Sequence, residues 1–194
     1  TLSIIVATRG RKTLKRTLRS ISRQVQPGDE VLVLCDDSGD AGDTARMKAM
    51  PRACGSHLAF IDDDDMYAPG ALEKLRRFAR ENPGRIGIFK MKHPVGTTHW
   101  RKGEPVLRYS NVSTQTFLVP NVPGKLGRWQ AGRPRPGGGE YAGDYVFITE
   151  TAELQGEPLF VDEVTVFARP VRNPVRLAWI RLRYHARLRS RLRR

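Results

Sequence analysis

Short apolar runs alternate with segments of helical periodicity over the first 90 residues. The run Leu2–Ala7 is continuous and rich in β-branched residues, which is typical of a strand buried on both faces. The apolar positions after it mark one face of a helix that Pro27-Gly28 ends: Leu14, Leu18, Ile21 and Val25. The chain is therefore predicted to open with a strand followed by a helix.

Three more apolar runs continue this alternation, and we predict strands at 31–35, 58–61 and 86–89, the first of them buried. A short helix near 44–50 and a longer one opened by Pro69 fill the intervals. Such alternation with short connections predicts an α/β fold with a mostly parallel, Rossmann-like sheet and helices on both faces. The second half is less regular, with strands expected at 116–119 and 159–168, a helix at 143–154, and a loop rich in Gly and Pro at 120–143.

Polar clusters follow three of the predicted strands, at Thr8–Arg11, Asp36–Asp40 and Asp62–Asp65. Ligands of parallel sheets bind beyond the carboxyl ends of the strands, so these clusters should meet at one site. Four consecutive carboxylates repel one another and need either open solvent or a cation. The run at 62–65 is thus either a solvated acidic turn or a divalent-cation site completed by substrate phosphates.

The order of these motifs resembles family 2 glycosyltransferases with the GT-A fold. Ser3–Thr8 with Arg11 resembles the opening "SIIVPTxNR", and Asp36–Asp40 resembles "DDGSxD". Phe60–Asp65, followed by Pro69 and Leu72, resembles "FLDADDxxxPxxLE". Near the end of the resemblance, which covers about residues 2–168, Gly127-Arg128-Trp129, Glu140 and Gly143-Asp144-Tyr145 resemble "GxF…GEDxxL".

The resemblance implies a nucleotide-sugar site at the first three motifs. Thr8, Arg9 and Arg11 would line the nucleotide pocket, with Arg11 near the diphosphate. Asp36 would accept a hydrogen bond from the base, and Asp37 would hold that loop.

In the acidic run, the resemblance makes Asp64 the ligand of Mn²⁺ or Mg²⁺. Asp62 would lie beside the ribose or a metal-bound water and complete the metal site. Asp63 is the alternative ribose residue, because the four-residue run leaves the register open by one position. The metal would neutralise charge on the leaving nucleotide diphosphate.

The catalytic base implied by the resemblance is Asp144, which would take a proton from the acceptor hydroxyl during inversion at the sugar carbon. An acid in the first turn of a helix is also stabilising by itself, so a structural role is the alternative. Glu140 is the second candidate base, since this chain has Gly143 where the family has Glu.

Trp129 is the candidate for stacking on the acceptor, with a core position as its alternative. The four histidines are scattered and interpreted as surface or structural residues.

These features predict a metal-dependent, inverting glycosyltransferase that uses a nucleotide-sugar donor, with a UDP-sugar expected on family grounds. The acceptor could be a glycan, a lipid-linked sugar, a protein or a modified nucleic-acid base. Two alternatives are a catalytically inactive GT-A-like nucleic-acid-binding protein and a nucleotidyltransferase on a similar sheet. The latter would release pyrophosphate, whereas a glycosyltransferase releases a nucleoside diphosphate.

The net charge of +14 is concentrated at the C-terminal end, since residues 164–194 contain ten Arg and no acidic residue. We therefore divide the chain into a catalytic domain at 1–170 and a basic amphipathic C-terminal helix at 171–194. Its expected apolar side comprises Leu177, Ile180, Tyr184 and Leu188. The tail would contact anionic lipids, nucleic acid, or the catalytic domain itself.

The chain has two cysteines, Cys35 and Cys54, which is too few for a disulfide scaffold, and we interpret Cys35 as a small buried residue. No apolar run reaches 18 residues. We expect a cytoplasmic location. The basic tail raises the alternative that the protein is attached to the inner membrane surface.

Overall fold

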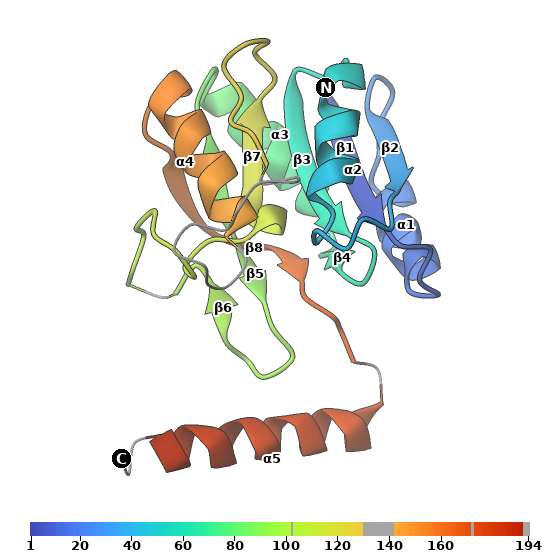
Figure 1. The fold of residues 1–194 in the computed structure, drawn as a ribbon, viewed down its shortest axis with the longest axis vertical. Coiled ribbons are helices and arrows are strands. Elements are labelled where there is room, and N and C mark those ends of the chain that lie inside the picture. The colour runs from blue at the N-terminus through green and yellow to red at the C-terminus, as the bar shows by residue number, and fades with distance from the viewer. Residues whose placement is uncertain (102, 130–141, 172, 192–194) are drawn as a thin grey trace.

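The computed structural model describes residues 1–101, 103–129, 142–171 and 173–191 (Figure 1). Eight strands form one sheet in the order β2-β1-β3-β7-β5-β8-β4, with β6 paired to β5. The strands are β1 (Leu2–Thr8), β2 (Glu30–Cys35), β3 (His57–Asp62), β4 (Met66–Tyr67), β5 (Gly87–Lys92), β6 (Thr98–His99), β7 (Phe117–Pro120) and β8 (Leu159–Phe167). The helices are α1 (Leu14–Ser22), α2 (Asp43–Ala49), α3 (Ala71–Glu81), α4 (Gly143–Gln155) and α5 (Pro174–Arg191), with short 3₁₀ turns η1 (Met50–Arg52) and η2 (Thr114–Thr116).

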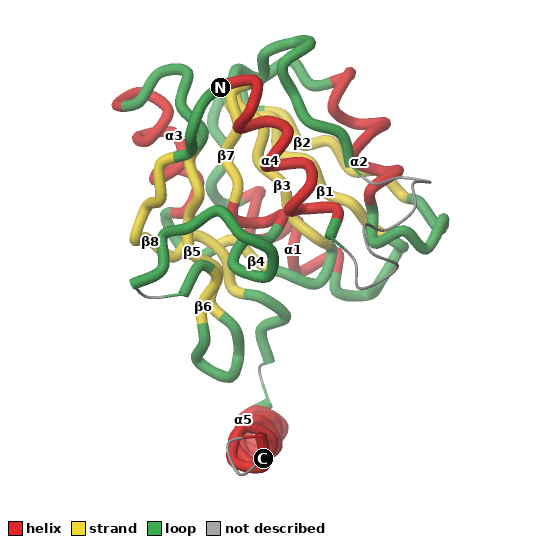
Figure 2. The backbone as a smooth tube through the Cα atoms, turned by 60° about the vertical axis from the view of Figure 1, so that its left-hand side comes forward, coloured by secondary structure: helices red, strands yellow, loops and turns green. Residues whose placement is uncertain are grey.

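Helices cover both faces of the sheet, as the alternation of elements predicts (Figures 1 and 2). Side chains of α1 and α3 share one apolar cluster with alternate residues of the central strands, such as Ile4 of β1 and Ile61 of β3. Side chains of α2 and α4 share the second cluster with the intervening residues, such as Ile5 and Phe60. Because successive side chains of a strand point to opposite faces, a strand between two helix layers must be apolar throughout.

The sheet is mixed, which corrects the prediction of a mostly parallel sheet. Of the seven described strand pairings, β1–β2, β1–β3 and β5–β8 are parallel and the other four are antiparallel. The difference arises because β7 lies between β3 and β5 and runs against both. The strand–helix–strand alternation that requires parallel strands ends at β5, and nothing local in 116–119 indicates the direction of that strand.

Strand β2 is less buried than its apolar sequence predicts. It forms an edge of the sheet, and its residues alternate between half-buried and exposed, with Val31 and Val33 exposed. Cys35 at its end is also exposed, so the interpretation of this residue as buried was wrong. An edge strand has one neighbour only, which leaves part of its surface open to solvent.

The fold brings the carboxyl ends of β1, β2 and β3 to one side of the molecule, since these three strands are parallel. The chain leaves β8 on that same side and continues into α5, which lies apart from the sheet and its helices (Figure 1). Within the described residues, no helix combines the length and the apolar character that crossing a bilayer requires. Half of the loop at 120–143, namely residues 130–141, lies outside the described residues, and Glu140 is among them.

Candidate active site

Asp63 joins the ends of β1 and β3. Its carboxylate is 2% exposed and accepts hydrogen bonds from the Thr8 hydroxyl (2.7 Å) and the Arg9 backbone N–H (3.1 Å). Its other oxygen accepts a hydrogen bond from the Arg11 guanidinium at 3.1 Å. Both oxygens of Asp63 are therefore engaged within the protein.

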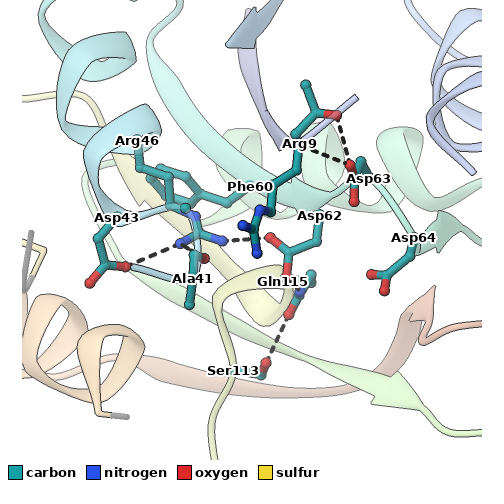
Figure 3. Close-up of polar contacts among 12 residues, drawn as sticks. Arg9, Ala41, Asp43, Arg46, Phe60, Asp62, Asp63, Asp64, Ser113 and Gln115 are labelled. Carbon is teal, nitrogen blue, oxygen red and sulfur yellow. Dashed lines mark hydrogen bonds and ion pairs between the residues drawn. The ribbon is translucent and has the colours of Figure 1, made fainter. Parts of the chain in front are cut away.

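Asp62 lies between two donors from distant parts of the chain (Figure 3). Arg46 Nη2 lies 2.5 Å from one carboxylate oxygen, and Gln115 Nε2 donates to the other at 2.6 Å. Burial raises the pKa of Asp62, and the nearby Arg46 opposes this increase. Both contacts fix the orientation of the carboxylate before any ligand arrives.

Arg46 is a site residue that the sequence reasoning missed. It lies on α2, is 1% exposed, and pairs with Asp43 as well as with Asp62. A buried guanidinium requires paired charges and hydrogen bonds, and this one also donates to the carbonyl oxygen of Ala41. The helical position of Arg46, three residues after Asp43, is compatible with an ordinary surface ion pair, so its burial could not be predicted from the sequence.

Trp129 lies in the core beneath Arg46. Its ring is 1% exposed, stacks on Phe147 with centroids 4.3 Å apart, and lies 4.7 Å from the Arg46 guanidinium carbon. This placement contradicts the proposed stacking of Trp129 on an acceptor, because neither face of the ring is open. Aromatic faces stabilise a nearby cation, so Trp129 supports the position of Arg46 instead.

Three carboxylates form a cluster that could hold a metal ion. One oxygen from each of Asp62, Asp64 and Asp65 lies within 4.8 Å of the others. Burial and the adjacent carboxylates raise the pKa of Asp65 to about 7. Hard divalent cations such as Mg²⁺ and Mn²⁺ prefer oxygen ligands, and a cation would relieve this repulsion. The donor set therefore fits the predicted metal.

A cavity of about 300 Å³ lies at the ends of β1, β2 and β3. Its lining combines all three predicted polar clusters: Thr8, Arg9, Arg11, Asp36, Gly39, Asp62, Asp63 and Asp64, together with Ala7, Ala41, Gly42 and Arg169. The Asp36 carboxylate accepts hydrogen bonds from the backbone N–H and hydroxyl of Ser38, and Lys48 lies 3.6 Å from it. Asp37 is exposed and is not among the described residues that line this cavity.

A second cavity of about 330 Å³ adjoins the first, and Ala41, Asp62 and Arg169 line both. Asp144, in the first turn of α4, also lines the second cavity. One oxygen of Asp144 accepts a hydrogen bond from the backbone N–H of Tyr145 at 2.9 Å. Burial nevertheless raises the pKa of Asp144 to about 6. A carboxylate with this pKa is better suited to accept a proton near neutral pH than an ordinary surface Asp.

Two histidines that we interpreted as surface or structural residues line this second cavity. His93 and His99 are half-buried, and their rings meet edge to face with centroids 4.7 Å apart. Burial lowers both pKa values, that of His99 to about 4, so both rings are neutral near pH 7. The strand pairing of β5 with β6 brings them together, and this pairing has no signature in the sequence.

Arg169 is the second site residue that sequence reasoning missed. It follows β8, and its backbone N–H donates to Asp65 at 2.8 Å. Its guanidinium Nε lies 3.3 Å from Asp64, while the side chain stays 78% exposed. The Arg11 guanidinium lies 2.9 Å from the same Asp64 oxygen. Two exposed guanidinium groups thus border the acidic cluster.

The α/β fold and the acidic cluster at the strand ends agree with the GT-A fold that the sequence resemblance implies. Residues 41–135 match the family model described as Glycosyl transferase family 2. The match covers just under half of the chain. Comparison with the curated proteins gives no match.

Among solved structures, the fold is similar to that of S. aureus TarS. The full TarS structure superposes with a TM-score of 0.63 at 17% identity, covering 88% of this chain and 37% of TarS. TarS 1-349 in complex with UDP-GlcNAc gives a TM-score of 0.63 at 17% identity, covering 89% of this chain and 59% of that one. The complex of TarS 1-349 with UDP gives 0.60 at 16% identity, covering 87% and 60%. At this identity the likeness establishes the shared fold, and the present chain spans less than two thirds of each of these structures.

Proposed function

We propose that this chain transfers a sugar from a nucleotide-sugar donor to an acceptor hydroxyl, with inversion at the sugar carbon. The observation that carries the proposal is the junction of two cavities at Asp62. One is lined by the three polar clusters at the strand ends, and the other contains the buried carboxylate of Asp144. The donor and the reacting hydroxyl would thus meet where the cavities join.

The first cavity suits a nucleoside diphosphate. Asp36 at the end of β2 offers an acceptor for the base, while Arg11 and Arg169 offer guanidinium groups for the diphosphate. The TarS structure in complex with UDP-GlcNAc supports a UDP-sugar as the donor class. Asp64, with Asp62 and Asp65 beside it, would hold Mn²⁺ or Mg²⁺, which neutralises the diphosphate and stabilises the departing nucleotide.

Asp144 would act as the general base in the second cavity. The acceptor hydroxyl donates its proton to the Asp144 carboxylate as its oxygen bonds to the anomeric carbon. The bond from that carbon to the diphosphate oxygen breaks on the opposite side, which inverts the configuration and releases the nucleoside diphosphate. Arg46 would keep Asp62 fixed at the boundary between the two substrates.

A ligand screen followed by product analysis tests this proposal. We expect UDP and UDP-sugars to raise the melting temperature only when Mn²⁺ or Mg²⁺ is present. Incubation with the stabilising UDP-sugar should then release UDP, slowly to water and faster once an acceptor is supplied. Release of pyrophosphate from a nucleoside triphosphate would instead identify a nucleotidyltransferase, and an absence of nucleotide binding would identify an inactive relative.

A further inference from the structure

Helix α5 has an apolar stripe that faces away from the rest of the molecule. A hydrogen bond from Arg181 Nε to the carbonyl oxygen of Pro94, at 3.1 Å, ties the helix to the turn between β5 and β6. Residues two positions away on an α-helix point to the opposite side, so Trp179 and Arg183 face outward. Figures 1 and 2 show α5 lying apart from the sheet and from the other helices.

The outward stripe consists of Val175, Trp179 and Leu182, spaced at i, i+4 and i+7. Their exposed fractions are 77%, 55% and 70%, which are large for apolar residues of these sizes. This stripe differs from the predicted one, since Leu177, Ile180 and Tyr184 are half-buried. Exposed apolar residues aligned along one helix are typical of a surface that binds another protein, a ligand or a membrane.

Arginines border the stripe without acidic partners on the helix. Arg176 and Arg183 lie seven residues apart on its edge, and the Arg183 guanidinium lies 4.4 Å from the Trp179 ring. Residues 174–191 contain six Arg and no Asp or Glu. Like charges this close repel one another, so an anionic partner would stabilise the helix.

The start of the helix is specified locally despite this exposure. The Asn173 side chain accepts hydrogen bonds from the backbone N–H groups of Val175 (3.0 Å) and Arg176 (3.1 Å), and Pro174 occupies the first turn. An Asn cap followed by Pro is a typical helix start. The segment therefore has its own signal to form a helix at this point of the chain.

We propose that α5 docks onto an anionic lipid bilayer, with the Val175–Trp179–Leu182 stripe at the acyl boundary and the arginines among the headgroups. An amphipathic helix with Trp and Leu on its apolar side and arginines beside it is suited to this interface. A second copy of the chain is disfavoured as the partner, since its own α5 has the same charge. Nucleic acid would engage the arginines but would leave Val175 and Leu182 in water.

The chain contains its own fluorescent probe for testing this proposal. Of its three tryptophans, Trp100 and Trp129 are buried and Trp179 is exposed. Vesicles of phosphatidylglycerol and phosphatidylcholine in equal parts should shift the tryptophan emission to shorter wavelength. Trp179→Phe should abolish the shift while vesicle co-sedimentation persists. Vesicles of phosphatidylcholine alone should bind far less protein.

Two pairs of variants separate the apolar and the electrostatic parts. Val175→Ser with Leu182→Ser keeps all charges and should weaken vesicle binding about tenfold. Arg176→Gln with Arg183→Gln should weaken vesicle binding about 25-fold, at about fivefold for each arginine. The matched control is Arg23→Gln with Arg52→Gln, which removes the same charge from exposed positions on the body and should change binding less than about twofold.

Four outcomes would overturn the proposal. The first is that the protein does not bind anionic vesicles. The second is that Val175→Ser with Leu182→Ser leaves vesicle binding unchanged, and the third is that Arg23→Gln with Arg52→Gln weakens it as much as Arg176→Gln with Arg183→Gln does. The fourth is a blue shift of the tryptophan emission that depends on protein concentration in the absence of vesicles, which would identify a second copy as the partner. Tight RNA binding without vesicle binding falls under the first. Because nucleotide binding is measured separately, failure here leaves the proposed sugar transfer untouched.

Discussion

The two adjoining cavities are built in different ways. The first cavity, which we propose binds the nucleotide and call the nucleotide cavity, is lined mainly by residues at the ends of three parallel strands, all within the first 64 residues. The second cavity combines segments that are far apart in the chain: the β5–β6 hairpin, the η2 turn, the start of α4 and the end of β8. Strand ends place the first cavity directly, whereas the second depends on how distant elements pack. The two proposed functions are divided in the same way: the first cavity binds the donor, and proton transfer takes place in the second.

The largest expected effect separates the two sides at Asp144. Asp144→Asn should lower the rate of UDP release from a UDP-sugar by about 10² to 10⁴, because an amide cannot accept the acceptor proton. The affinity for UDP, measured by calorimetry with Mn²⁺, should not change. Glu140→Gln is the matched variant. A normal rate in Asp144→Asn together with a loss in Glu140→Gln would transfer the role of base to Glu140.

The converse change lies on the nucleotide side. Asp64→Asn should weaken Mn²⁺-dependent binding of UDP by about 100-fold, since it removes a charged ligand from the acidic cluster. Binding of UDP in the presence of a chelator should be weak and the same in both proteins. An unchanged difference between metal and chelator in the variant would refute the metal role of Asp64.

The contrast between the cavities also explains what the sequence could predict. The alternation of apolar runs correctly predicted the first strands and helices, because each pattern is local. The motifs at Thr8–Arg11 and Asp62–Asp65 pointed to the nucleotide cavity for the same reason. The position of β7 between β3 and β5, and with it the mixed sheet, depends on pairing between distant segments.

The residues that sequence reasoning missed depend on tertiary packing in the same way. Arg46 reads as one member of an ordinary ion pair on α2, and its burial follows only from the packing of Trp129 and Phe147 beneath it. Arg169 follows a strand with no motif, and it reaches Asp64 from more than 100 residues away in the chain. Trp129 was assigned to the acceptor by its place in a motif, whereas packing places it in the core.

Arg169 is a residue that both cavities share, so its substitution tests whether they act together. Arg169→Gln should weaken UDP binding about tenfold, through loss of one guanidinium contact to the diphosphate. The transfer rate at saturating donor should fall by a smaller factor, because Asp144 is unaffected. Arg80→Gln, an exposed arginine paired with Glu73 on α3, provides the control and should change neither quantity. An Arg169→Gln protein with normal UDP affinity would exclude Arg169 from the donor site.

The last prediction is a pH dependence of the transfer rate that the titration of Asp144 should set. Burial raises the pKa of Asp144 to about 6, while Arg46 and the N–H groups of Tyr145 and Thr114 oppose the increase and Asp43 adds to it. Below pH 6 the protonated carboxyl cannot accept a proton, so the rate at saturating donor and metal should fall about tenfold for each pH unit there. Above pH 7 it should be constant.

Two controls separate this titration from that of the acidic cluster. UDP affinity measured over the same pH range reports the nucleotide side, and the residual activity of Asp144→Asn should lose the inflection near pH 6. If Asp144→Asn keeps the inflection, the group that titrates is not Asp144, and the base for proton transfer is not in the second cavity. If the inflection disappears while the UDP affinity of the variant follows the wild-type pH curve, the base lies in the second cavity and the first cavity binds only the donor.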